Sequence, residues 1–221
     1  MRLEQRFLIL RKAIYGQMRK AYFILALVLV SLLTSCTSVF LGLYGMKNPK
    51  QLTNEQLKNE ARHQGIPLQQ LYSIDTSYWS YLAKVDTAKH QEVKNHSQPL
   101  QAMYFDANGQ LFRFYVNCYA GGFPNLKWNR FGGLNQFPPL PQAPEDSLLP
   151  FNQLAAFAKP LEEAQDFVQS ETTIVVFWNR MMGRQSKRFV KLINRNAQLS
   201  NTPIQLLFVN TDDLFLDLMA E

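Results

Sequence analysis

The stretch at residues 172–178 reads TTIVVFW, and the stretch at residues 203–209 reads PIQLLFV. Each is a short apolar run rich in β-branched or aromatic residues, which is typical of a strand buried on both faces of a sheet. Residues 186–199 lie between them and place Phe189 and Ile193 on one helical face. A strand, a helix and a second strand predict a parallel pair joined by a crossover helix. The expected fold class is therefore α/β (α+β).

Two more helices are predicted around this unit. Residues 161–169 have an amphipathic pattern, and residues 212–219 follow the second apolar run directly. The order helix, strand, helix, strand, helix assigns residues 151–221 to one α/β unit.

The clearest hairpin in the chain lies upstream of this unit. Residues 100–105 and 110–117 alternate apolar and polar side chains, and Asp106-Ala107-Asn108-Gly109 between them has the composition of a turn. Before the hairpin, Thr53 and Gln56 have the spacing of a capping box, which predicts a helix over residues 54–63 that ends at Gly65. Residues 51–136 are thus expected to form a helical segment plus a β-hairpin.

Residues 137–150 contain five prolines and predict a semi-rigid connector before the α/β unit. The three histidines (His63, His90 and His96) have no metal-ligand spacing and are expected at the surface, so no metal is predicted. No phosphate-binding loop or catalytic triad is apparent, and no cofactor is predicted.

The formal net charge of +6 does not predict nucleic-acid binding. Residues 1–35 hold six basic residues and one acidic residue, whereas residues 36–221 hold 17 basic and 16 acidic residues. A nucleic-acid-binding surface needs clustered positive charge, so nucleic acid is excluded as the expected partner. The basic N-terminus is instead typical of a targeting segment.

That segment continues with the apolar run AYFILALVLVSLL at residues 21–33 and then Leu33-Thr34-Ser35-Cys36. A charged start, a short apolar run and small residues are typical of a signal peptide. The last four residues resemble the lipobox of bacterial lipoproteins. The resemblance implies that residues 1–35 are removed and that Cys36 carries a diacylglycerol and further acyl chains such as palmitate. Residues 36–50 would then be a lipid-anchored tether.

The resemblance also implies a location. Thr37 follows the cysteine where Asp would retain a Gram-negative lipoprotein at the inner membrane, so the periplasmic face of the outer membrane is expected. The alternative is an uncleaved signal anchor, because residues 21–44 are uncharged and long enough to span a bilayer. Both interpretations place the body of the protein outside the cytoplasm.

The residues Val176-Phe177-Trp178, followed by Gly183 and a basic helix, resemble the thioredoxin superfamily. That family carries a Trp-Cys-Gly-Pro-Cys site at this point, but here the sequence reads Met182-Gly183-Arg184-Gln185 with no thiol. Because thiol–disulfide exchange needs a thiolate at the helix N-terminus, the resemblance implies an inactive redox site. The family's final hairpin has no counterpart before Glu221, so an incomplete or rearranged fold is expected. The hairpin at residues 100–117 would supply the antiparallel strands.

Two features leave the function open. Arg184, Arg188, Lys191 and Arg195 recur at helical spacing and form either a solvated face or a contact surface for anionic headgroups or an acidic partner. Cys118 is expected to be a buried, inert thiol, although a thiol-dependent enzyme that uses it stays an alternative. The leading hypothesis is a non-enzymatic envelope lipoprotein that acts as a scaffold or partner-binding module.

Overall fold

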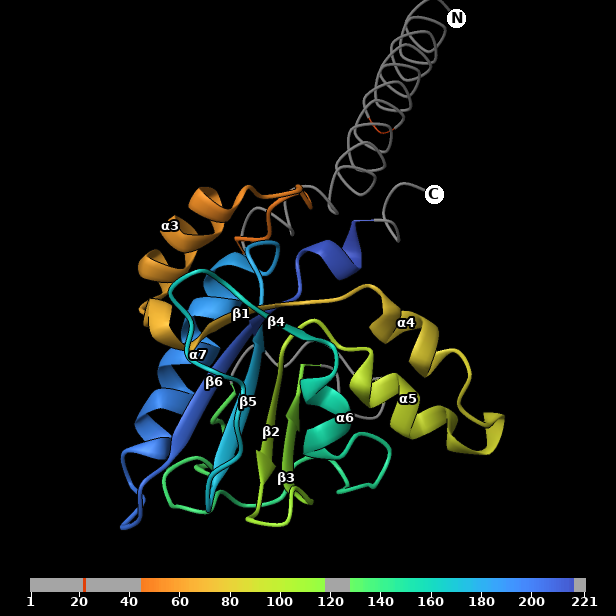
Figure 1. Ribbon diagram of the computed structural model, residues 1–221, viewed down its shortest axis with the longest axis vertical. Helices are drawn as coiled ribbons and strands as arrows, with labels where there is room; N and C mark the ends of the chain where they lie inside the picture. Colours follow the sequence, from red (N-terminus) through yellow and green to blue (C-terminus); the bar gives the residue numbers. More distant parts are fainter. Residues whose placement is uncertain (1–21, 23–44, 118–127, 217–221) are drawn as a thin grey trace, which may run out of the picture. The chain divides into compact units, whose positions relative to one another are not determined.

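The two apolar runs form neighbouring parallel strands, β5 (Thr173–Trp178) and β6 (Gln205–Asn210), as predicted. The helix α7 (Gly183–Ala197) connects them and begins one turn earlier than expected (Figure 1). The computed structural model describes residues 45–117 and 128–216, together with Tyr22. Within those residues the fold is α/β, with a mixed sheet of six strands in the order β3-β2-β5-β6-β1-β4.

The predicted hairpin is confirmed and belongs to this sheet. Its strands are β2 (Gln101–Phe105) and β3 (Leu111–Val116), and β2 runs antiparallel to β5 with Met103 opposite Val175. The turn is fixed by the Asp106 carboxylate, which accepts hydrogen bonds from the backbone N–H groups of Asn108 and Gln110, both at 2.9 Å. Since β5 pairs with β6 on one side and with β2 on the other, the hairpin occupies the side of β5 that β6 leaves free.

Two short strands complete the other edge of the sheet, and neither is predicted from the sequence. Strand β1 (Leu71–Ile74) runs parallel to β6, and β4 (Ala158–Pro160) pairs antiparallel with β1. Both strands are only three or four residues long, so neither carries a periodic pattern that sequence reading can detect.

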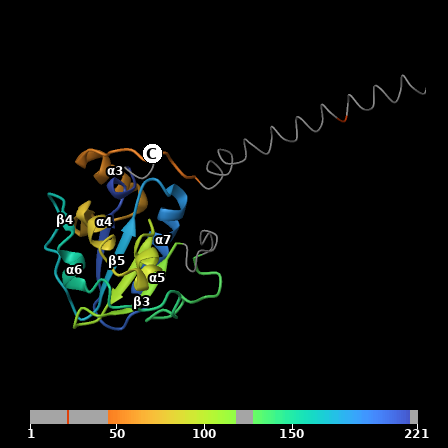
Figure 2. The same ribbon diagram turned by 90° about the vertical axis from the view of Figure 1, so that its right-hand side faces the viewer.

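Alternate side chains of β5 point into two separate cores. On one face, Ile174 and Val176 pack with Phe189 of α7 and with the helix α3 (Asn54–Gln64). On the other face, Val175 and Phe177 pack under α4 (Ser77–Leu82) and α6 (Phe151–Ala155), with α5 (His90–His96) beside them. Figure 2 views the molecule from the side on which α4, α5 and α6 lie. Burial of both faces explains why residues 172–178 are almost wholly apolar.

The capping box that predicts α3 is confirmed. The backbone N–H of Gln56 donates to the Thr53 hydroxyl, and the backbone N–H of Thr53 donates to the Gln56 side chain. Gly65 ends the helix in the left-handed conformation, with φ of 80°. Both ends of α3 are therefore set by local sequence.

The helix predicted over residues 161–169 is wrong, because this segment forms an irregular strap with no helical run. Its backbone bonds to the start of β1 and the turn before it: the N–H of Leu161 donates to the carbonyl of Leu71, and the N–H of Gln165 donates to the carbonyl of Gln69. The Glu162 carboxylate also lies 2.9 Å from the ammonium of Lys58 on α3. These long-range partners outcompete the local helical pattern, whose own stabilisation is small.

Residues 137–150 pack along the outer edge of β3. Ala143 is buried and forms a bridge with Phe114, and the Gln142 side chain bonds both the N–H and the carbonyl of Val116. Beyond β6, only a 3-10 turn at Asp213–Phe215 is observed where a helix over residues 212–219 is predicted, and residues 217–221 lie outside the described part of the chain.

Candidate functional site

The start of α7 is the place where a thioredoxin-family protein would carry its thiols, and here it is covered by the chain's own backbone. Gly183 has a φ of 46°, and a Cβ added to it would overlap the carbonyl oxygen of Gly45. The N–H of Lys47 also donates to the carbonyl of Met181 at 2.8 Å. Residues 45–47 thus lie directly on the first turn of the helix.

The four residues Met182-Gly183-Arg184-Gln185 have different surroundings. Met182 and Gln185 are buried, and the Gln185 Oε1 has no hydrogen-bond partner among the residues that the structure describes. Arg184 is exposed, although its aliphatic stem lies against Gly45. This arrangement contains no nucleophile, and neither buried side chain is accessible to a disulfide substrate.

Polar side chains at the carboxyl ends of β5 and β6 hold this turn in place. The Asp212 carboxylate accepts from the backbone N–H groups of Arg180 at 2.7 Å and Met181 at 3.1 Å, and the Asn179 side chain accepts from the N–H of Met182 at 2.8 Å. Burial raises the pKa of Asp212, and these hydrogen bonds only partly oppose that rise. Asp212 therefore fixes the loop, and its carboxylate is not free to serve as a base.

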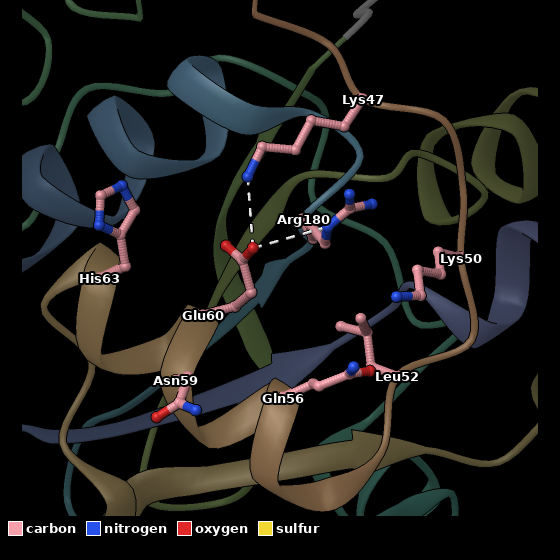
Figure 3. Close-up of a pocket in the computed structure, with 8 residues that line it drawn as sticks. All are labelled: Lys47, Lys50, Leu52, Gln56, Asn59, Glu60, His63 and Arg180. Carbon is pink, nitrogen blue, oxygen red and sulfur yellow. Dashed lines mark hydrogen bonds and ion pairs between the residues drawn. The ribbon is translucent and has the colours of Figure 1, made fainter.

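A pocket of about 440 Å³ lies beside this turn, between α3 and residues 47–52 (Figure 3). Its centre is the Glu60 carboxylate, which lies 3.3 Å from the ammonium of Lys47 and 3.5 Å from the Nε of Arg180. Lys50 and His63 line the pocket and make no ion pair with any described residue. The pocket is next to the carboxyl end of β5, where α/β sheets commonly bind ligands. It offers positive charge and hydrogen bonds, but two of its three Lys and Arg side chains, Lys47 and Arg180, already pair with Glu60.

The exposed side of α7 forms a second hollow, of about 420 Å³, which we call the α7 groove. Three of the four residues predicted as a basic face (Arg188, Lys191 and Arg195) line it, whereas Arg184 does not. The remaining lining residues are Trp128, Asn129, Arg130 and Leu192. The lining therefore carries four cations and no acidic residue.

The sequence alone does not place residues 128–131 at this groove. The Trp128 ring packs on Phe189 of α7, with ring centroids 4.1 Å apart, and its buried Nε1 has no acceptor within the described part of the chain. The buried side chain of Asn196 donates to the carbonyls of Leu134 and Gln136, which ties the same loop to α7. The only signal in the sequence is that Arg130 lies between Trp128 and Phe131, just before Gly132 and Gly133.

The expectation that all three histidines lie at the surface is wrong for His96. His63 and His90 are exposed, but the His96 side chain is fully buried, stacks on Phe114 and lies 3.0 Å from the Asp146 carboxylate. Burial by itself would raise the pKa of Asp146, but the hydrogen bond and charge of His96 hold it below its ordinary value. Asp146 comes from the proline-rich segment, 50 residues further along, so no local spacing indicates the pair.

Several predicted sites lie outside the described residues: the lipobox residues Leu33, Thr34 and Ser35, the lipidation residue Cys36, and Cys118. Within residues 45–117 and 128–216, no group of three or more His, Cys, Asp or Glu side chains could hold a metal ion. A search of the described helices finds none with the length and apolar character needed to cross a membrane.

Comparison of the chain with protein-family models, with curated proteins and with solved structures finds no match in any of the three.

Proposed function

We propose that this chain is a lipid-anchored protein of the bacterial cell envelope whose thioredoxin-like domain binds a partner and carries out no redox chemistry. The covered start of α7 carries this proposal. A thiol-exchange site must expose a low-pKa sulfur at a helix N-terminus. Here Met182 and Gln185 are buried and the backbone of Gly45 occupies the space above Gly183.

The strand arrangement supports the thioredoxin-like part of the proposal. Three parallel strands (β1, β6 and β5) are continued on the free side of β5 by an antiparallel hairpin. In the thioredoxin family the hairpin follows the parallel strands in sequence, whereas here β2 and β3 precede β5. The proposed fold is therefore a rearranged version, in which the hairpin is inserted after β1 and fills the same side of the sheet.

The N-terminal sequence supports the anchor. A basic start, an apolar run of thirteen residues and Leu33-Thr34-Ser35-Cys36 resemble a lipoprotein signal, and Thr37 favours the periplasmic face of the outer membrane. Two or more acyl chains on Cys36 would hold the protein stably in a bilayer, because each buried methylene contributes about 0.8 kcal/mol.

Mass spectrometry of the protein isolated from native envelopes tests the anchor. We expect a mature chain that begins at Cys36 and carries a diacylglycerol thioether. A Cys36→Ser variant should accumulate as an uncleaved precursor, and a Cys118→Ser variant should be processed normally as the matched control. An acyl-free native chain that begins with Met1 would contradict the lipoprotein and favour the uncleaved signal anchor.

A disulfide-reduction assay tests the non-redox part. With dithiothreitol as the reductant and insulin as the substrate, the chain should not accelerate the reduction. Acceleration that disappears in Cys118→Ser would contradict the proposal and favour a thiol enzyme that uses Cys118.

A further inference from the structure

We propose that the α7 groove, together with the exposed Phe131 beside it, is a membrane-contact surface that binds anionic phospholipid headgroups. The inference rests on the proposed membrane anchor, because the anchor keeps the bilayer close to the domain. It adds a second contact with the membrane, between the domain and anionic headgroups, which the anchor by itself does not define.

The first observation is the concentration of charge. Arg188, Lys191 and Arg195 project from successive turns of α7, and Arg130 joins them from the neighbouring loop. None of the four makes an ion pair with any residue of the described ranges, and no acidic side chain lines the groove. Unpaired cations on one face are attracted to an anionic membrane surface, and each contributes about a fivefold increase in affinity.

The second observation is an aromatic side chain that points into solvent. Phe131 is 88% exposed, the most exposed of the large apolar side chains that the structure describes. The guanidinium of Arg130 lies 5.4 Å from the centre of its ring. Leu140 is also exposed and is held at this loop by a hydrogen bond from its N–H to the carbonyl of Gly133. Exposed apolar side chains among cations are typical of surfaces that insert shallowly into a headgroup layer.

The third observation is where the tether enters the domain. Gly45 lies on the first turn of α7 and comes nine positions after Cys36, so the proposed anchor keeps the bilayer within about 30 Å of that turn. The fifteen residues of α7 span about 22 Å, and its groove cations (Arg188, Lys191 and Arg195) lie between the sixth and the thirteenth residue. The whole groove can therefore reach the membrane that holds the anchor.

These observations favour a membrane over an acidic protein. A protein partner has to be captured from solution, whereas the anchored bilayer is permanently present at high effective concentration. A hollow lined by four cations, with the exposed side chain of Phe131 beside it, also matches headgroups with acyl chains beneath them.

The test uses the full chain, reconstituted in lipid vesicles through its own N-terminal segment, which anchors it whether or not it is acylated. A Phe131→Trp substitution provides the probe, and wild type gives the background of the native tryptophans. The vesicles are either phosphatidylcholine alone or phosphatidylcholine with about one third phosphatidylglycerol, with brominated acyl chains as the quencher in both. The anchor is the same in both, so a difference in quenching reports contact by the domain.

For the Phe131→Trp variant we expect strong quenching of the added indole signal in the anionic vesicles, weak quenching in the neutral ones, and loss of the difference in high salt. Replacing Arg188 and Lys191 by Glu should weaken the contact at least ~25-fold, from about fivefold for each cation. The matched control is Lys84→Glu with Lys89→Glu, which reverses two exposed cations near α4 and α5 on the opposite face of the sheet. The control should leave quenching unchanged.

Equal quenching in neutral and anionic vesicles would overturn the inference, as would an equal effect of the control pair. If polyglutamate in solution binds the chain through Arg188 and Lys191 while vesicle charge has no effect, the surface serves an acidic protein and the inference fails. The proposed anchor is tested separately by the mass of the native N-terminus. Charge-dependent quenching in a chain that is never acylated would support the membrane-contact surface and contradict the proposed lipoprotein anchor.

Discussion

Substitution of Gly183 by Ala tests whether the chain's own backbone closes the start of α7. Gly183 and Gly65 both have positive φ, 46° and 80°, so Ala at either position costs about 1 kcal/mol of backbone strain. A Cβ at position 65 meets no atom within 4 Å, whereas a Cβ at position 183 overlaps the carbonyl of Gly45. Gly65→Ala is therefore a control that has the strain without the collision.

The collision has a calculable consequence. Residues 45–47 must move away from α7, and the hydrogen bond from Lys47 to Met181 is then lost, at a net cost of about 1 kcal/mol. Met46 also loses part of its packing against the core on the α7 face. We expect Gly183→Ala to lower the free energy of unfolding by about 2–3 kcal/mol, against about 1 kcal/mol for Gly65→Ala.

Urea unfolding measures this difference. With a slope of about 2 kcal/mol per molar urea, the midpoint should fall by ~1 M or more for Gly183→Ala and by ~0.5 M for Gly65→Ala. Trypsin should also cut after Lys47 and Lys50 faster in Gly183→Ala under native conditions, because the covering segment is released. Equal midpoints and equal cleavage rates for the two variants would refute the close approach and remove the main support for a closed site.

Four further predictions concern the pair His96–Asp146, residues 182–185 and a helix cap. Asp146→Ala should lower the free energy of unfolding by about 3 kcal/mol, and a double-mutant cycle with His96→Gln should show losses that do not add; additive losses would mean that the two side chains do not interact. The difference in unfolding free energy between wild type and Asp146→Ala should be full above about pH 4 and should shrink as the pH falls through the lowered pKa of Asp146, because a carboxyl with a depressed pKa stabilises the fold only while it is ionised. Urea titrations between about pH 5 and pH 2 measure this difference. A difference that stays constant over that range would exclude a stabilising role of the ionised carboxylate. Met182→Cys with Gln185→Cys should place two thiols three positions apart but give no insulin reductase activity, because both positions are buried. Activity above that of wild type would show that the site is open. Thr53→Ala should cost about 1 kcal/mol through loss of the cap of α3, as measured by thermal unfolding, and an unchanged midpoint would show that the capping box contributes nothing.

Several features could be predicted because the information is local. The capping box at Thr53 and Gln56, the turn at residues 106–109 and the two buried runs each specify their own backbone within a few residues. The joining of the hairpin to the sheet is expected from the resemblance to the thioredoxin superfamily alone, which leaves a place for antiparallel strands, and β2 does pair with β5.

Other features needed the folded chain. The basic residues of α7 are visible at helical spacing, but Trp128 and Arg130 reach the same groove only because Asn196 bonds the loop that carries them. The burial of His96 depends on Asp146, which lies on a distant segment.

The sequence by itself determined the strands β2, β3, β5 and β6, the caps of α3, the absence of thiols at residues 182–185 and the charge separation between the N-terminus and the body, since each depends on neighbouring residues. The tertiary structure decided that residues 161–169 form a strap rather than a helix and that Gly45 covers the start of α7. The physical reason is that these outcomes depend on hydrogen bonds and close contacts between residues about a hundred or more positions apart, whose free energy exceeds the small local preference for helix.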